Sequence, residues 1–276
     1  MTADRGAAFR ALHRPGTPFI LSNAWDLGSA RMLAALGAEA IATTSSGFAF
    51  TLGRPDMGHV SRDEMLSHCS DLVSAVNLPV SGDLENGYGD APDAVAETVR
   101  LAFEAGLAGC SIEDVAPPEG AAYDRALAVE RIRAAVAAAR ALPRDFVLVA
   151  RADGVMTEAY SMDEALVRVR AFRDAGADCL YVPLPPDLAA LGAIIEAANG
   201  RPVNALAVGP FAALTRADFA RAGVARISLG GALARATHEV IATWANAMRE
   251  EGRFNATPAM SGASVDALLS QAKPSP

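Results

Sequence analysis

Eight short apolar runs alternate with longer stretches of helical periodicity over most of this sequence. The runs span residues 19–23, 40–44, 78–83, 109–114, 146–151, 179–183, 202–206 and 225–230. Strands that alternate with helices pair in a parallel sheet, because each helix carries the chain back to the start of the next strand. Eight such units close the sheet on itself, with the active site at the carboxyl ends of the strands. The sequence therefore predicts an α/β protein of the (β/α)8 TIM-type barrel class.

Four of the helical stretches end in a glycine that lies shortly before an apolar run. These glycines are Gly37, Gly106, Gly176 and Gly223, each preceded by a similar phrase such as Glu-Ala-Gly or Asp-Ala-Gly. Glycine adopts the left-handed conformation that ends many helices without steric strain. The recurring phrase is a structural repeat, and it predicts where four of the helices end.

The length of the chain suits one barrel followed by a short tail. With 276 residues and 51% hydrophobic composition the chain can bury a large core, and no break in composition divides it. We expect a barrel domain over residues 1–250 and a tail over residues 251–276, with a helical pattern at 264–271. A lone amphipathic helix is not stable in water, so the tail helix must dock on another surface. A neighbouring subunit is one possibility.

Charge and cysteine content limit the possible partners of the protein and its cellular compartment. The net charge is -8 and no run of basic residues occurs, which argues against nucleic acid or a membrane as partner. Residues 1–16 contain no apolar segment of an export signal, and no later stretch reaches the ~18 apolar residues of a membrane span. Cys69, Cys110 and Cys179 are odd in number and widely spaced, which is typical of buried free thiols. We expect a cytoplasmic protein.

Lysine is almost absent from the chain. Lys273, three residues from the C-terminus, is its only lysine. Schiff-base catalysis needs a desolvated lysine amine, which a tail flanked by Pro and Ser does not provide. The composition therefore excludes a lysine-dependent aldolase, and carbon–carbon chemistry would need another electron sink.

Carboxylates follow two of the apolar runs. Asp83 and Glu85 end the third run, and Glu113 and Asp114 end the fourth. Alternate residues of a strand share a face, so Asp83 and Glu85 would both point into the barrel mouth. An acid within a buried parallel strand is unfavourable unless it is paired or bound to a metal. Oxygen ligands without His or Cys suit Mg²⁺ or Mn²⁺ better than zinc, so the sequence predicts such an ion.

Other polar residues at the strand ends have two interpretations. Asp26, Asp153 and Ser228 could face the active site, or they could cap the following helices, as Asp and Ser commonly do. The sequence leaves both interpretations open. The remaining candidates at these ends are Asn23, residues 43–46, Arg151 and Asn204.

Five phrases occur in an order typical of one enzyme group. They span residues 22–30, 43–47 with 52–56, 83–89, 111–114 and 149–153. In these phrases the chain resembles the isocitrate lyase and phosphoenolpyruvate mutase superfamily over nearly its full length. The resemblance implies a β/α barrel with Mg²⁺ at its mouth, chelated by a 2-oxo acid or an oxalate-like enolate. It also implies a homotetramer, a dimer of dimers in which the last helix swaps onto a partner subunit.

The resemblance assigns metal ligands and substrate ligands to separate residues. Asp83 would bind Mg²⁺ (or Mn²⁺) directly, while other carboxylates would reach the ion mostly through water; these are Asp56, Glu85 and Glu113. Arg151 would pair with the substrate carboxylate or the developing enolate oxygen, a task that suits a guanidinium fork. The other residues expected to bind substrate are Thr44, Ser45, Ser46 and Asn204. The candidate catalytic residues are Arg151, Glu113 and Tyr123.

Two departures from the superfamily narrow the reaction. The superfamily's isocitrate lyases carry a Lys-Lys/Arg-Cys-Gly-His loop after the fourth strand, whereas residues 115–124 contain no Lys, Cys or His. Its phosphorus enzymes use a loop Lys, Asn or Thr and a His on the sixth strand, where this chain has Pro183. In the altered loop Tyr123 or Glu119 could supply a proton, although Tyr123 could instead pack at the start of the next helix.

Three functions remain, and they belong to two classes. The first is a Mg²⁺-dependent carbon–carbon lyase or decarboxylase, acting through an enolate on a small 2-oxo or 2-hydroxy di- or tricarboxylate. The second is a carbon–phosphorus bond enzyme, which the missing loop lysine argues against. The third is a non-catalytic protein that binds 2-oxo acids. Asp83, Glu85, Glu113 and Arg151 are common to the first and third, so the sequence does not separate them; we predict the first.

Overall fold

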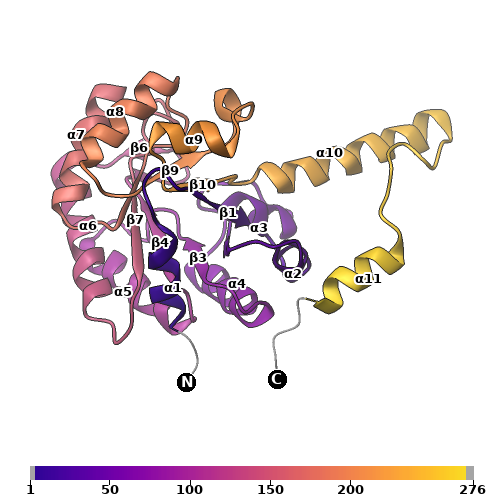
Figure 1. The fold of residues 1–276 in the computed structure, drawn as a ribbon, viewed down its shortest axis with the longest axis horizontal. Helices are drawn as coiled ribbons and strands as arrows, with labels where there is room; N and C mark the ends of the chain where they lie inside the picture. Colours follow the sequence, from indigo (N-terminus) through magenta and orange to yellow (C-terminus); the bar gives the residue numbers. More distant parts are fainter. Residues whose placement is uncertain (1–3, 272–276) are drawn as a thin grey trace.

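Eight parallel strands close into a barrel, as the sequence predicts (Figure 1). The computed structural model describes residues 4–271. Around the barrel the strands follow the order β1-β10-β9-β8-β7-β4-β3-β2. Their bounds are β1 Phe19–Asn23, β2 Ala40–Ala42, β3 Val80–Asp83, β4 Gly109–Glu113, β7 Val147–Arg151, β8 Cys179–Tyr181, β9 Val203–Leu206 and β10 Arg226–Ser228. Each strand lies within one of the eight apolar runs.

Helices cover the outside of the barrel between successive strands (Figure 1). They are α2 Leu27–Ala35, α3 Ser45–Thr51, α4 Arg62–Ala75, α5 Pro92–Glu104, α6 Arg125–Arg140, α7 Met162–Asp174, α8 Leu188–Ala198 and α9 Arg216–Ala222. Helix α10, Ala232–Asn246, follows the last strand and projects away from the barrel (Figure 1). A short antiparallel hairpin of β5 Val115–Ala116 and β6 Ala121–Ala122 follows β4. The four glycines predicted to end helices have φ values of 93°, 88°, 99° and 90°, which confirms their left-handed conformation.

A short helix closes the amino-terminal end of the barrel. Helix α1, Arg5–Leu12, places Phe9 in one buried cluster with Phe19 and Val147, the first residues of β1 and β7. His13 follows this helix and packs edge-on against Phe9 and Phe19. Because α1 blocks this end, a ligand reaches the barrel interior from the carboxyl ends of the strands.

The tail forms an arm that extends from the barrel (Figure 1). Helix α10 continues through Ala247–Glu251, so the predicted boundary at residue 250 falls inside this helical segment. Helix α11, Gly262–Gln271, agrees with the predicted tail helix and lies against α2 of the same chain. Apolar side chains on the arm remain exposed, including Ile241 at 64% and Phe254 at 74%. Lys273 lies outside the described residues.

The three cysteines are buried free thiols, as expected. Within residues 4–271, no helix combines the length and the apolar character needed to cross a bilayer.

Adding a methyl group at Gly109 is expected to destabilise the barrel. A Cβ at this position in β4 would overlap the backbone carbonyl oxygen of Val147 in the neighbouring strand. Overpacking of a buried site costs about 1–3 kcal/mol, so Gly109→Ala should lower the free energy of unfolding by that amount in urea denaturation. The matched control is Gly192→Ala on the exposed side of α8, where a Cβ meets nothing within 4 Å. That change should stabilise the protein by about 0.5–1 kcal/mol, and equal effects at both sites would contradict the prediction.

Asp178 is expected to stabilise the fold in a pH-dependent way. Its carboxylate accepts hydrogen bonds from Arg140 at 2.6 Å, Arg10 at 2.7 Å and the Leu148 N–H at 2.8 Å. Burial acts to raise the pKa of Asp178, but these hydrogen bonds outweigh burial and hold its pKa below the ordinary value. The stabilisation is therefore fully present above the unfolded-state pKa of about 3.9 and is lost as the pH falls through the lower folded-state value.

Asp178→Asn should accordingly lower the free energy of unfolding at pH 7 by about 2 kcal/mol. The difference from wild type should narrow when urea denaturation is repeated near pH 3. Asp174→Asn is the control, because Asp174 is exposed and, among residues 4–271, its ion pair is with Arg173. A difference at Asp178 that is the same at both pH values would contradict the linkage.

Candidate active site

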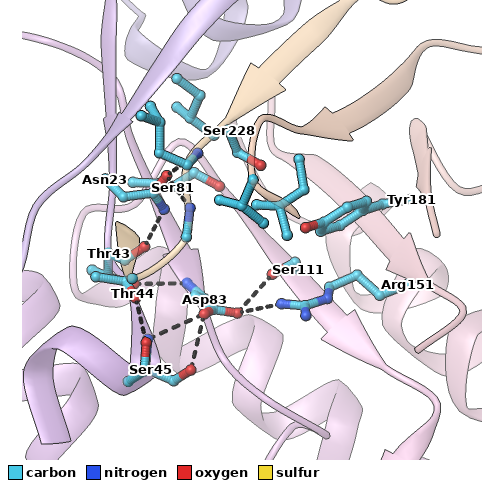
Figure 2. A pocket seen from close by; sticks show the side chains of 18 of the residues that line it. Asn23, Thr43, Thr44, Ser45, Ser81, Asp83, Ser111, Arg151, Tyr181 and Ser228 are labelled. Carbon is cyan, nitrogen blue, oxygen red and sulfur yellow. Dashed lines mark hydrogen bonds and ion pairs between the residues drawn. The ribbon is translucent and has the colours of Figure 1, made fainter. Parts of the chain in front are cut away.

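A pocket of about 190 Å³ opens at the carboxyl ends of the barrel strands (Figure 2). All eight barrel strands contribute to its lining. The polar part includes Ser45, Asp83, Ser111, Arg151, Tyr181 and Ser228, which reach the pocket from different sides (Figure 2). The pocket therefore has the location that the barrel pattern predicts for an active site.

Arg151 is the centre of the charge network in the pocket. Register between β4 and β7 places it beside Glu113, and its Nη1 lies 2.8 Å from Glu113 Oε1 and 2.9 Å from Asp83 Oδ1. Asp153 accepts from its Nε at 3.0 Å and its Nη2 at 2.6 Å, which holds the guanidinium as a fork. Burial opposes the charge of Arg151, but the carboxylates of Asp153, Glu113 and Asp83 outweigh it and raise its pKa. Arg151 therefore stays a fixed cation at the pocket wall.

Asp83 ends β3 with both carboxylate oxygens engaged. Oδ2 accepts from the backbone N–H and the hydroxyl of Ser45, each at 3.1 Å (Figure 2). Oδ1 accepts from Arg151 and, at 3.3 Å, from the Ser111 hydroxyl. The backbone N–H of Asp83 donates to the Thr43 hydroxyl at 2.7 Å. These contacts fix the carboxylate at the pocket surface.

The other three predicted metal ligands gather near Asp83. Asp56 lines the pocket, whereas Glu85 and Glu113 are buried and lie outside its lining. Burial raises the pKa of Glu85 to about 7, and the negative charges of Asp83 and Asp56 add to this effect. Burial also raises the pKa of Asp56, and it raises that of Glu113 well above its ordinary range despite Arg151. The chain thus concentrates acidic groups where a cation would stabilise their charged forms.

This set of carboxylates fits a divalent cation held largely through water. Asp56, Asp83, Glu85 and Glu113 offer oxygen donors alone, the ligand type of Mg²⁺. Oε2 of Glu85 is buried without a hydrogen-bond partner, so it is an acceptor that a hydrated cation would satisfy. Across residues 4–271, no three acidic, His or Cys side chains converge closely enough to hold an ion directly. Mg²⁺ commonly keeps several waters and binds through one or two carboxylates, so the set remains compatible with it.

Three hydroxyl residues at the start of α3 face the pocket. Thr44 caps this helix and is hydrogen-bonded to Ser46 at 3.1 Å between the two hydroxyl oxygens. Together with Ser45 they line the pocket next to Asp83. Their hydroxyl groups are available to a ligand in the pocket, and the substrate-binding role that the resemblance implies for them stays a prediction.

Tyr123 lies outside the pocket lining, and its role as a proton donor stays a prediction that this position does not favour. Its hydroxyl donates to Asp90 at 2.6 Å and accepts from Asn86 at 2.8 Å, while Arg131 stacks over its ring. Its side chain therefore joins the loop after β4 to the loop between β3 and α5. Glu119, the other loop candidate, is exposed in the hairpin connection.

Asp114 lies outside the pocket lining and stabilises the elements around it. Its carboxylate accepts from the Asp153 N–H at 2.8 Å, the Tyr160 hydroxyl at 2.8 Å and Arg168 at 3.0 Å. These contacts tie the end of β4 to the loop after β7. They also orient Asp153, which in turn holds Arg151.

The sequence left a capping role and an active-site role open for Asp26, Asp153 and Ser228, and the structure separates the three residues. Asp26 caps α2 by accepting from the Ser29 N–H at 2.6 Å. Asp153 caps no helix, since α7 starts after Ser161. Ser228 lines the pocket and likewise caps no helix, because α10 starts after Gly231.

Asn204 lies outside the pocket lining, and its contact with the substrate stays a prediction that this position does not favour. It is the second residue of β9, and its side chain donates to Ser228 at 2.9 Å and accepts from Arg226 Nε at 2.8 Å. Arg226 itself lines the pocket, and sequence reasoning missed it. The available signal was a charged residue inside the apolar run 225–230.

Comparison with known proteins points to one enzyme family. The sequence profile of the phosphoenolpyruvate phosphomutase family matches residues 9–249. The chain is 32% identical over 190 residues to 2,3-dimethylmalate lyase of Eubacterium barkeri, covering 66% of this chain and 64% of that protein. A crystal structure described as a lyase/mutase from Burkholderia cenocepacia has a TM-score of 0.91 and 48% identity, covering 96% of this chain and 95% of that chain. Oxaloacetate acetylhydrolase in complex with its product oxalate has a TM-score of 0.85 and 25% identity, covering 96% and 94% of the two chains.

The barrel, the strand-end carboxylates and these similarities have one explanation. This chain is an enzyme of the phosphoenolpyruvate phosphomutase family, within the superfamily that also contains the isocitrate lyases.

Proposed function

We propose that this protein is a Mg²⁺-dependent lyase that makes or breaks a carbon–carbon bond in a small 2-oxo or 2-hydroxy di- or tricarboxylate. The observation that carries the proposal is the position of Arg151. Its guanidinium is fixed by Asp153 and presents Nη1 at the pocket wall between Asp83 and Glu113. A cation fixed before the reaction stabilises negative charge where that charge develops.

Different side chains of the pocket would have different roles in such a reaction. Cleavage of a bond next to a carbonyl leaves negative charge on an enolate oxygen, and Arg151 would stabilise this oxygen. Thr44, Ser45 and Ser46 would hold the adjacent carboxylate through their hydroxyl and backbone donors. This enolate chemistry needs no lysine.

The metal would be held mainly by Asp83. Asp56, Glu85 and Glu113 would bind its water ligands, which would also satisfy the buried Oε2 of Glu85. When bound, Mg²⁺ supplies Lewis acidity to the carbonyl of a 2-oxo acid. Mn²⁺ prefers similar ligands and is expected to substitute for it.

A second candidate is cleavage of a carbon–phosphorus bond, favoured by the family profile that the chain matches. The hairpin over residues 115–122 and its flanks contain no lysine to contact a phosphoryl group. The third candidate is binding of 2-oxo acids without turnover. It would use the same pocket and differ only in the absence of a proton donor or acceptor.

One panel of compounds separates these functions. The protein is incubated with 2-oxo and 2-hydroxy diacids and with phosphonopyruvate, with Mg²⁺ or with EDTA, and products are followed by proton and phosphorus NMR. We expect metal-dependent cleavage of a carbon acid. Phosphate release from phosphonopyruvate alone would favour the second candidate, and metal-dependent binding without products would favour the third.

We also propose a homotetramer in the cytoplasm. The exposed apolar side chains of α10 and the following segment favour burial against another subunit, and they include Val240, Ile241, Met248 and Phe254. Three buried free thiols fit a reducing compartment. Light scattering of the purified chain would measure the subunit number, and a monomer at micromolar concentration would contradict the assembly.

A further inference from the structure

Arg226 is a buried cation without a counterion. It begins β10, two residues before Ser228 on the same strand face, and its exposure is 4%. Its Nε donates to Asn204 at 2.8 Å, whereas its Nη1 has no hydrogen-bond partner. Among residues 4–271, no Asp or Glu forms an ion pair with Arg226.

The other buried arginines of the barrel are satisfied by the chain itself. Arg151 contacts three carboxylates, and Arg168 contacts Asp114 and Glu164. Arg131 donates to three backbone carbonyls. Arg226 differs from all of them because its charge is not compensated by the chain. An uncompensated buried charge costs several kcal/mol.

The groups packed around Arg226 do not supply the missing charge. Burial lowers the pKa of Arg226 and the positive charge of Arg151 lowers it further, whereas Cys179, Tyr181 and Asp83 act to raise it. Asp83 is engaged by Ser45 and Arg151 and forms no ion pair with Arg226. Cys179 and Tyr181 remain neutral, since burial raises the pKa of Cys179 to about 11 and that of Tyr181 still further. His13 carries no charge near neutral pH either, because burial, reinforced by the charge of Arg226, lowers its pKa to about 3. A ligand anion is the remaining source of compensation.

The location of Arg226 suits contact with a ligand that spans the pocket. It lines the same pocket as Asp83 and Arg151. Strands β10 and β3 are separated by β1 and β2 in the barrel order, so the two ends of the pocket lie on different sides of the barrel. Figure 2 shows Ser228, which follows Arg226 along β10, across the pocket from Ser45 and Asp83. Arg226 starts its strand while Asp83 ends its own, which places Arg226 deeper in the barrel.

We propose that Arg226 determines specificity for dicarboxylates by binding the substrate carboxylate farthest from Asp83. The inference rests on the proposed function, in which the 2-oxo acid end of the substrate lies near Asp83. Asn204 is a positioning residue: Ser228 fixes its amide, and its Oδ1 holds Arg226 Nε. The Nη groups are then left to form charge-assisted hydrogen bonds with a carboxylate.

Ligand pairs that differ in one carboxylate test the proposal. Oxaloacetate is compared with 2-oxobutanoate and 2-oxoglutarate with 2-oxopentanoate, by titration calorimetry with Mg²⁺, and oxalate probes the Asp83 end alone. In wild type, the dicarboxylate of at least one pair should bind on the order of 30-fold more tightly than its partner. Equal affinities within both pairs would overturn the proposal. Failure of wild type to bind oxalate would instead count against the proposed function.

Arg226→Met should remove the preference for the dicarboxylate and leave oxalate and the monocarboxylates at their wild-type affinity. Arg226→Lys keeps the charge and should retain part of the preference. Equal weakening of all ligands, or an unchanged preference in Arg226→Met, would overturn the proposal, because either result means that Arg226 only supports the fold. Arg173→Met, far from the pocket on α7, is the matched control and should keep the wild-type preference. If Arg226→Met does not fold, the wild-type ligand pairs still test the proposal, because equal affinities within both pairs would overturn it.

Discussion

Arg151→Lys is expected to reduce turnover by about 10²–10³-fold, the effect of removing one fixed donor to a developing oxyanion. Lysine keeps the positive charge, but its single ammonium group lacks the planar fork of arginine. It cannot donate two N–H groups to Asp153 while a third faces Asp83 and Glu113. The loss should therefore appear in kcat for whichever acid is cleaved, measured by steady-state kinetics. Oxalate affinity should change less, since oxalate carries its charge before any reaction.

A matched change at a buried arginine outside the pocket separates chemistry from stability. Arg131→Lys weakens contacts to the backbone carbonyls of Asn86, Gly89 and Asp90, and it should lower the melting temperature while kcat stays near the wild-type value. If Arg151→Lys retained wild-type kcat, the charge alone would suffice and the fork held by Asp153 would have no role in the reaction. Equal losses of kcat in the two variants would mean that the effect at Arg151 comes from general destabilisation.

Asp83→Ala is expected to abolish the metal-dependent stabilisation of the protein by oxalate. A ligand present at 100 times its dissociation constant stabilises the folded state by about 2.7 kcal/mol, which a melting experiment detects readily. Without the Asp83 carboxylate the proposed direct ligand is missing, so the difference between Mg²⁺ and EDTA should fall to near zero. The comparison uses this difference within each variant, because Asp83→Ala also releases Ser45 and Arg151 and changes the melting temperature itself.

The control for this experiment is Asp71→Ala, a change at an exposed acid of α4. It should keep the wild-type difference between Mg²⁺ and EDTA. A metal-dependent shift that survives Asp83→Ala would mean that the strand-end carboxylates stabilise the fold and do not bind the metal. The proposed enolate mechanism would then have no metal site at these residues.

The sequence predicted the barrel and the mouth of its pocket well, because both depend on local patterns. Each of the eight strands lies within an apolar run, since burial on both faces of a parallel strand requires such a run. Gly106 and Gly176 end helices because only a residue without Cβ adopts that backbone without strain. Asp83 and Arg151 were found because polar residues at the carboxyl ends of strands meet at one edge of the barrel.

The sequence by itself determined the order of the strands and helices and the residue types at the pocket mouth. Only the tertiary structure decided which of these side chains act together. The contact of Asn204 with Arg226 depends on the register between β9 and β10, and Tyr123 faces Asp90 because of how the loop after β4 packs. Such contacts join residues far apart in sequence, and they exist only once the barrel has closed. A charged residue inside an apolar run makes Arg226 unusual in the sequence, but only the closed barrel shows that its charge is buried and unpaired.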